Sequence, residues 1–276
     1  MHAAPAATTD RWADRLAGRP APVLAATREA LEAWRARPDR VDANALADVV
    51  LRDPLMTLRL LALVSQRLGP RLSRPVETVT AGLVLLGIEP FFHALDGPPP
   101  LETLEERLDG NPTALAGALD LVQRAHRAAR LAAAFAVHRQ DEDAEVLHQA
   151  ALLTQFGGLL LWCEAPQEAA AIAARLAQDP QMRQTQAQRA ELGVELAVIE
   201  HRLLQAWGLP PSLRAHLLPT GLAAPGEQCV ALAVRIARHL ERGWDNPALA
   251  EDFAQLGTLL HLPAPAAAAL VREVEG

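Results

Sequence analysis

The apolar positions of this chain recur at the spacing of an α-helix along almost its whole length. Leu, Ala, Arg, Glu and Gln, all strong helix formers, are frequent, whereas β-branched runs and two-residue hairpin turns are scarce. Three joints, Asp53-Pro54, Asn111-Pro112 and Asn246-Pro247, each place a capping side chain before a proline at the first helical position. The pattern predicts an all-α protein.

Three of the predicted helices carry more specific expectations. The helix over 54–68 is apolar nearly all round its axis, which predicts burial. The apolar run predicts one helix over 144–163, and its polar Thr154 and Gln155 argue for a core helix over a membrane span. The helix over 113–138 has a seam spaced alternately by four and three residues, which predicts packing on another helix. That seam consists of Leu115, Leu119, Val122, His126, Ala129, Ala133 and Ala136.

One segment interrupts the helical pattern most clearly. Residues 96–111 contain Gly97-Pro98-Pro99-Pro100 and an acidic cluster that runs from Glu102 to Asp109. We therefore expect an N-terminal helical bundle over 10–96, a connecting loop over 97–111 and a second helical bundle over 112–276.

Composition and charge narrow the chemistry. The chain has 276 residues, its 26 basic residues are all Arg, and it has no Tyr, so a Schiff-base lysine, a Walker A phosphate loop and a phenolic acid are excluded. A net charge of −7 disfavours duplex nucleic acid as a partner, because such binding needs a basic face. Cys163 and Cys229 lie far apart among apolar residues, which fits a reducing cytoplasm. The N-terminus shows no basic region followed by an apolar stretch, so we expect a cytoplasmic protein without a signal peptide or membrane anchor.

A few polar side chains stand at positions expected to be buried. His126 interrupts the apolar seam, although a histidine there is more often bonded to a carbonyl group than to a metal. Thr154 and Gln155 lie within an apolar run, so they must find hydrogen bonds or face a cavity. For Thr154 the simplest solution is a bond to the carbonyl four residues earlier. The following glycine pair, Gly157-Gly158, predicts the close approach of another backbone.

Residues 52–74 form a local basic patch in an otherwise acidic chain. Its members are Arg52, Arg59, Arg67, Arg71 and Arg74, set against the single acid Asp53. The patch suits an acidic partner or an anionic ligand. Internal salt bridges to the acidic segment near 102–109 are an equally good interpretation.

Three segments of the chain carry recognisable motifs. Leu51–Leu61 is similar to a D-P-x-L-x-x-x-L-L segment, Arg74–Gly87 is similar to a P-V-x-S-x-x-x-A-x-x-x-L-G helix, and Leu203–Pro210 has the form L-L-x-x-W-x-L-P. In this order the motifs resemble those of the HDOD proteins, bacterial signalling modules related to the metal-dependent HD phosphohydrolases. The likeness covers about residues 20–240 as one unit. It implies an N-terminal helical bundle packed against an HD-like helical bundle.

The resemblance also shows where this chain departs from a catalytic pattern. Active HD hydrolases bind metal through a first His, an adjacent His-Asp pair and a later Asp. Here His126 stands at the first position, Thr154 and Gln155 replace the pair, and Arg238 stands in place of the later Asp. A hydroxyl and an amide are weak ligands, and a guanidinium repels a divalent cation. We therefore expect no catalytic residue, no metal and no cofactor, but a vestigial pocket formed by His126, Thr154, Gln155, His216 and Arg238.

These observations leave several functions open. The first is a non-catalytic signalling or regulatory module that acts through protein contacts or an unidentified small ligand. The second is a diverged HD-type phosphohydrolase with a rebuilt metal site. The third is a helical adaptor that binds an acidic partner through the arginine patch. A weaker fourth is a remnant pocket that binds an anion such as a nucleotide.

Overall fold

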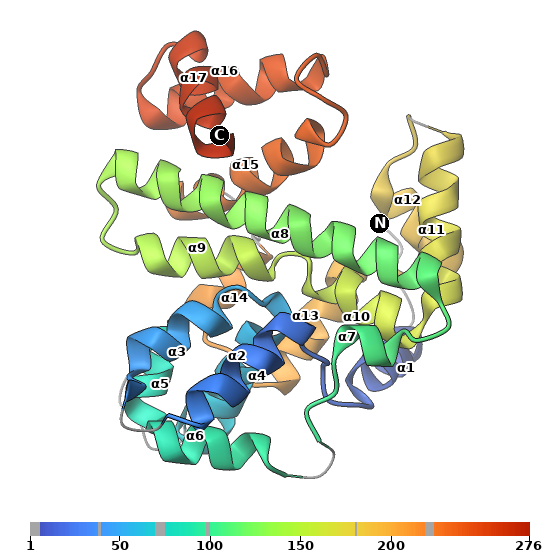
Figure 1. Ribbon diagram of the computed structural model, residues 1–276. Helices are drawn as coiled ribbons and strands as arrows, with labels where there is room; N and C mark the ends of the chain where they lie inside the picture. Colours follow the sequence, from blue (N-terminus) through green and yellow to red (C-terminus); the bar gives the residue numbers. More distant parts are fainter. Residues whose placement is uncertain (1–5, 38–39, 70–74, 98–99, 180, 219–223) are drawn as a thin grey trace. The chain divides into compact units, whose positions relative to one another are not determined.

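The computed structural model describes residues 6–37, 40–69, 75–97, 100–179, 181–218 and 224–276. Throughout this part of the chain the regular secondary structure is α-helical, and the extended segments meet in an isolated bridge between Val23 and Thr103 (Figure 1). The all-α class predicted from the sequence is confirmed.

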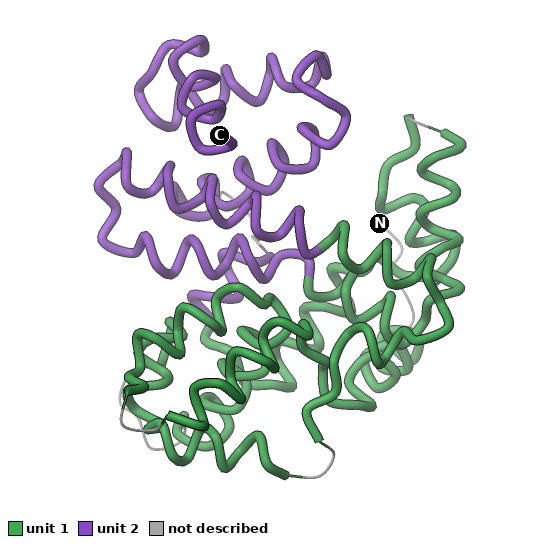
Figure 2. The backbone as a smooth tube through the Cα atoms, in the orientation of Figure 1, with its two compact units in different colours: residues 1–121, 156–210 green, residues 122–155, 211–276 purple. Residues whose placement is uncertain are grey.

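The chain divides into two compact units that exchange segments along the sequence (Figure 2). Unit 1 comprises residues 1–121 and 156–210, and unit 2 comprises residues 122–155 and 211–276. Helix α8 (Pro112–Arg139) runs through the first of these boundaries. The consecutive division into 10–96, 97–111 and 112–276 stays a prediction.

Unit 1 holds the N-terminal helices together with a second group from the middle of the chain. Its helices, apart from the start of α8, are α1 (Ala6–Ala17), α2 (Ala25–Arg35), α3 (Ala43–Val50), α4 (Pro54–Arg67), α5 (Val79–Leu86), α6 (Ile88–Leu95), α7 (Leu104–Arg107), α10 (Phe156–Glu164), α11 (Pro166–Gln178), α12 (Gln184–Leu192) and α13 (Leu196–Ala206). Helix α4 packs on α3, α5 and α10. Its first two turns are buried nearly all round the axis, for example at Leu55, Leu58 and Leu61, as the sequence predicts, whereas its C-terminal end is exposed.

Asp53 begins α4 and explains the aspartate-proline motif. Its carboxylate accepts hydrogen bonds from the backbone N–H groups of Leu55 (2.9 Å) and Met56 (3.0 Å) in the first turn of α4. It also accepts one from the N–H of Leu24 (2.7 Å), just before α2. Burial raises the pKa of Asp53, while these N–H donors oppose that rise. One buried side chain therefore caps α4 and ties it to the start of α2.

Unit 2 contains the rest of α8 and five further helices. These are α9 (Ala144–Leu153), α14 (Pro211–Leu217), α15 (Pro225–Leu240), α16 (Ala248–Leu260) and α17 (Ala264–Glu275). Helix α15 packs on α9, α14 and α16, and α16 packs on α17. The buried face of α15 includes Cys229, Ala233 and Ile236. Burial raises the pKa of Cys229 to about 12, so this thiol stays protonated in the core.

Two helix predictions need correction. The single helix expected over 144–163 is broken at Thr154 and Gln155, so that α9 ends and α10 begins there. In α8 the seam is buried at Val122, Ala129 and Ala136, as predicted. Elsewhere the buried residues come one position earlier than expected, namely Ala114, Ala118, Ala125 and Ala132.

One stretch of the described chain has the length and hydropathy of a membrane span. It is Ala144–Glu164, and 78% of its apolar window is buried within the protein, as is typical of a core helix. Helices α16 and α17 pass the same test only when taken together, and they are bent by 98° at their junction.

Candidate functional site

The five residues of the predicted vestigial pocket all belong to unit 2. His126 comes from α8 and is half-buried at the edge of the seam, because the buried position is Ala125. Its electrostatic neighbour is His148 of α9. Burial lowers the pKa of His148; Glu145 raises it, and the second imidazole lowers it further. The structure thus places His126 and His148 close together, and only His126 was predicted as a site residue from the sequence.

Thr154 and Gln155 form local hydrogen bonds where α9 ends. The hydroxyl of Thr154 donates a hydrogen bond to the carbonyl oxygen of Ala151 (2.8 Å), three residues earlier and not four. The amide of Gln155 donates to the same hydroxyl (3.5 Å). Both side chains are therefore engaged with neighbours at the position where a His-Asp pair would bind a metal.

The donor set around these positions does not fit a metal ion. Among the described residues, no three His, Cys, Asp or Glu side chains gather as ligands of a metal would. A threonine hydroxyl and a neutral amide are poor ligands for a transition metal. No step of metal chemistry follows from this arrangement.

His216 lies next to the start of α15, whereas Arg238 lies near the end of that helix. His216, on α14, donates from Nδ1 to the carbonyl oxygen of Ser212 (2.8 Å), and its Nε2 would lie 3.1 Å from a Cβ added at Gly226. Arg238 stands on the same helix as Gly226 but about 18 Å further along its axis, at ~1.5 Å per residue. The charged neighbours of Arg238 are Arg124, Asp252, Arg235 and Arg242. The structure therefore does not bring His216 and Arg238 together.

The arginine patch of residues 52–74 is only partly open to a partner. Arg59 donates to the carbonyl oxygen of Ala21 (3.2 Å), and burial together with the nearby Arg107 lowers its pKa. Arg52 and Arg67 are exposed. Arg67 lines a cavity of about 770 Å³ whose wall also holds Arg35, Phe92 and His93. Arg71 and Arg74 lie outside the described residues.

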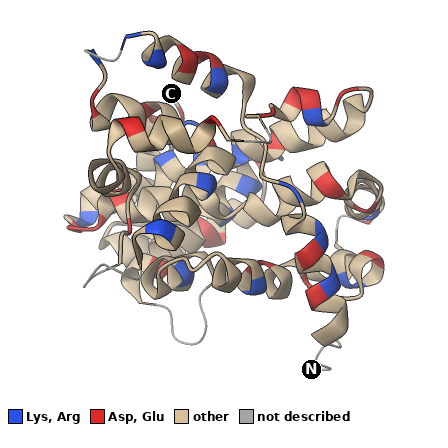
Figure 3. Ribbon diagram, turned by 90° about the horizontal axis from the view of Figure 1, so that it is seen from below, with Lys and Arg blue, Asp and Glu red and all other residues tan. Residues whose placement is uncertain are grey.

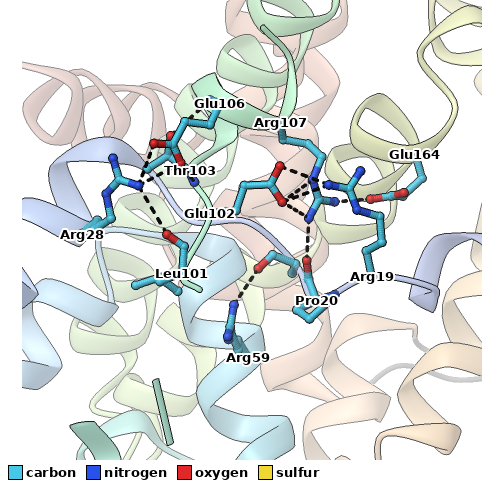
Figure 4. Close-up of polar contacts among 11 residues, drawn as sticks. Arg19, Pro20, Arg28, Arg59, Leu101, Glu102, Thr103, Glu106, Arg107 and Glu164 are labelled. Carbon is cyan, nitrogen blue, oxygen red and sulfur yellow. Dashed lines mark hydrogen bonds and ion pairs between the residues drawn. The ribbon is translucent and has the colours of Figure 1, made fainter. Parts of the chain in front are cut away.

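Two acids of the segment near 102–109 pair with arginines outside the patch, so internal salt bridges between patch and segment stay a prediction. Glu102 binds Arg19 (3.1 Å) and Arg107 (2.6 Å), as Figure 4 shows. Glu106 binds Arg28 (2.8 Å). In the charge view, basic and acidic positions are interspersed along the helices (Figure 3). Glu102 and Glu106 are thus occupied by arginines outside the patch.

Arg107 is the centre of a polar cluster that was not predicted from the sequence. Its side chain is only 2% exposed and binds Glu102, Glu164 and the carbonyl oxygen of Pro20 (3.0 Å). A backbone pair adds to this tie, because Leu104 N–H donates to Val23 (2.7 Å) and Val23 N–H donates to Glu102 (3.0 Å). The sequence signal for this cluster was Arg107 itself, a single arginine within the acidic segment near 102–109. The cluster fixes the predicted connecting loop to the chain before α2.

Glu200 is a second buried charge that the sequence did not reveal. It lies on α13, and a Cβ at Gly157 would come within 2.2 Å of its carboxyl oxygen. Burial raises the pKa of Glu200 to about 7, while a hydrogen bond from the Gly157 backbone opposes that rise. The glycine pair thus makes room for side chains and not for the predicted backbone, since Gly158 faces Leu121.

Comparisons with known proteins agree with this architecture. The sequence pattern of the HDOD domain matches residues 22–218. The structure is similar to the MmoQ response regulator of Methylococcus capsulatus str. Bath, at 21% identity and a TM-score of 0.68, over 92% of this chain and 98% of that one. It is also similar to a virulence factor of Campylobacter jejuni subsp. jejuni, at 18% identity and a TM-score of 0.67, over 92% of this chain and 90% of that one.

A third structure carries the family name itself. It is an HDOD domain protein of unknown function from Geobacter sulfurreducens, at 15% identity and a TM-score of 0.50, over 98% of both chains. No curated protein matches the chain. At these identities the solved structures establish the fold, and the family match covers most of the sequence. The chain belongs to the HDOD family.

Proposed function

We propose that this protein is a non-catalytic, cytoplasmic regulatory module in bacterial signal transduction, acting through protein contacts or a small anionic ligand. Membership of the HDOD family supports a regulatory role. The names of two proteins with the same fold, a response regulator and a virulence factor, point the same way. Neither name describes a reaction.

One observation carries the non-catalytic part of the proposal. Thr154 and Gln155 occupy the position of the metal-binding pair and are hydrogen-bonded to Ala151 and to each other. Hydrolysis by an HD-type site needs a metal that polarises the phosphoryl group and activates water. The Thr154 hydroxyl and the Gln155 amide are already used in local hydrogen bonds. They are also weaker metal ligands than the histidine and aspartate of an active HD site.

A helical adaptor that binds an acidic partner through the arginine patch is a weaker second candidate function. Its support is the exposed Arg67, which lines the cavity of about 770 Å³ in unit 1. Against it, Arg35 in the same wall is paired with Asp96 (2.7 Å), and Arg59 is used internally. An acidic partner would therefore meet fewer open arginines than the sequence suggests.

A phosphodiesterase assay tests the proposed function. Purified protein is incubated with bis(4-nitrophenyl) phosphate and Mn²⁺, beside an active HD hydrolase as the positive control and the His126→Ala variant. We expect the wild type to release nitrophenol at the rate of the His126→Ala variant and of buffer. Metal-dependent hydrolysis by the wild type that is lost in His126→Ala would overturn the proposal and favour the diverged phosphohydrolase.

A further inference from the structure

A groove in unit 2 is formed where three helix ends meet. The C-terminal end of α8, the N-terminal half of α15 and the C-terminal end of α16 enclose a volume of about 790 Å³. Its basic wall residues are His138, Arg139, Arg235 and His261. Most of the groove lies beyond residue 218, where the family match ends. It is therefore a feature of this chain that the family pattern does not describe.

The wall of the groove is basic, although the chain as a whole is acidic. Among the described residues that line it, no side chain is acidic. Arg235 is held in place from behind by Asp252, a buried carboxylate that accepts from its Nε (2.6 Å) and also binds Nδ1 of His239 (2.5 Å). Arg139 donates to the carbonyl oxygen of Pro225 (2.8 Å) and pairs with Asp141 (3.2 Å). These contacts use part of the five N–H donors of each guanidinium and fix its position.

Two strained backbone positions also lie in this groove. Gln140 (φ 60°) and His261 (φ 56°) are the non-glycine residues with positive φ in the described chain, and both line it. They stand where α8 and α16 end, a place that glycine or asparagine normally fills. A left-handed conformation is costly for a residue with a Cβ. Gln140 and His261 thus place two polar side chains in the groove, and their positive φ angles lower the stability of the fold.

The remaining wall is apolar or neutral. Leu232, Leu259 and Leu260 provide the apolar surface. Gln255 positions the basic wall, because its Oε1 accepts a hydrogen bond from Arg235 (2.6 Å) and its Nε2 donates to Glu251 (2.9 Å). The Thr258 hydroxyl donates to the carbonyl oxygen of Ala254 (3.1 Å). The volume is in the range of small-molecule sites, which combine an apolar lining with a few converging polar groups. A ligand that fits both parts has an anionic end for the basic wall and an apolar or planar body for the leucines.

We infer that this groove binds a small organic anion, in which a phosphate or a carboxylate is carried on an apolar or planar body. The anion lies against Arg139, Arg235 and His261, and the body lies against Leu232 and Leu259. The inference rests on the proposed regulatory function and deepens it, because it names the chemical class of the small ligand. It places that ligand away from Thr154 and Gln155.

Calorimetric titration at low salt tests the groove with four probes. Phenyl phosphate and benzoate carry the two anions on the same ring, inorganic phosphate lacks the ring, and phenol lacks the anionic group. We expect saturable 1:1 binding of phenyl phosphate or benzoate, whichever has the correct anion, and weaker binding of inorganic phosphate and phenol. Whichever of the two ring compounds binds more tightly shows whether the groove recognises a phosphate or a carboxylate.

Two groove variants and one matched control decide whether the site is the one described. Arg139→Gln and His261→Gly each weaken binding by about tenfold or more, as expected for the loss of a charge-assisted hydrogen bond. His261→Gly also raises the melting temperature, because glycine relieves the positive φ. Arg242→Gln, the same charge change at an exposed residue of unit 2 outside the groove wall, leaves binding unchanged.

Four results would overturn the inference. The first two are the absence of saturable binding by both ring compounds, and inorganic phosphate binding as tightly as phenyl phosphate. The third is an affinity that is equal in the wild type and both groove variants. The fourth is an equal loss of affinity in Arg242→Gln, because binding would then respond only to the overall charge of the protein. None of these results depends on hydrolysis, so failure here is distinct from failure of the phosphodiesterase test.

Discussion

Single buried polar residues connect distant parts of this chain, and Asp53 is the clearest case. It accepts three backbone hydrogen bonds, from Leu24, Leu55 and Met56, whereas the exposed cap Asp42 accepts one, from Ala45. We expect Asp53→Ala to lower the free energy of unfolding by about 2–4 kcal/mol, and Asp42→Ala by about 1 kcal/mol. Urea denaturation of both variants measures the difference. Equal losses would mean that Asp53 only caps α4.

Glu200 gives the protein a pH-dependent stability. Its pKa is about 7 in the folded state, against 4.5 for an unburied glutamate, so the unfolded state loses the proton first as the pH rises. The stability of the wild type should therefore fall between about pH 4.5 and pH 7, by up to about 3 kcal/mol. Glu200→Gln removes this fall, because the amide has no charge to bury. Urea denaturation at pH 5 and at pH 8 checks it; the same loss in both proteins would assign the effect to other groups.

At the scale of the elements, close helix contacts depend on glycine. A Cβ added at Gly117 of α8 would come within 2.4 Å of the Trp162 ring of α10, whereas one at Gly97 meets nothing within 4 Å. Gly117→Ala should cost about 1–3 kcal/mol through overpacking, although alanine favours a helix. Gly97→Ala should change stability by less than about 0.5 kcal/mol. Thermal unfolding compares the two, and an unaltered Gly117→Ala protein would show that the ring can move.

The sequence predicted elements better than it predicted registers and partners. Helix α4 was identified correctly because its apolar residues surround the axis. The buried stripe of α8 was misplaced by one residue at several positions, because alanine at Ala125 and Ala132 is small enough to stand on either face. The break at Thr154 was missed because it depends on a local hydrogen bond to Ala151. Ion pairs between residues that are distant in sequence depend on the tertiary fold. The sequence therefore did not show that Glu102 and Glu106 would bind arginines outside the patch.

At the scale of the whole molecule, the family fold is retained while the candidate chemistry is dispersed. His126, Thr154 and Gln155 belong to unit 2 with His148 nearby, but His216, on α14, lies near the start of α15 and Arg238 lies near its end. The basic groove of unit 2 lies at other residues again. The proposed regulatory role therefore rests on residues other than the metal-binding positions of an HD hydrolase.

Metal analysis tests the central claim most directly. The protein is purified without chelators, dialysed against Mn²⁺ and against Fe²⁺, and its metal content is measured by inductively coupled plasma mass spectrometry. The Thr154→His, Gln155→Asp double variant, which restores the family's ligand pair, serves as the comparison. A non-catalytic module predicts far less than one bound metal per wild-type chain. One or more tightly bound ions per wild-type chain, lost in His126→Ala, would contradict it.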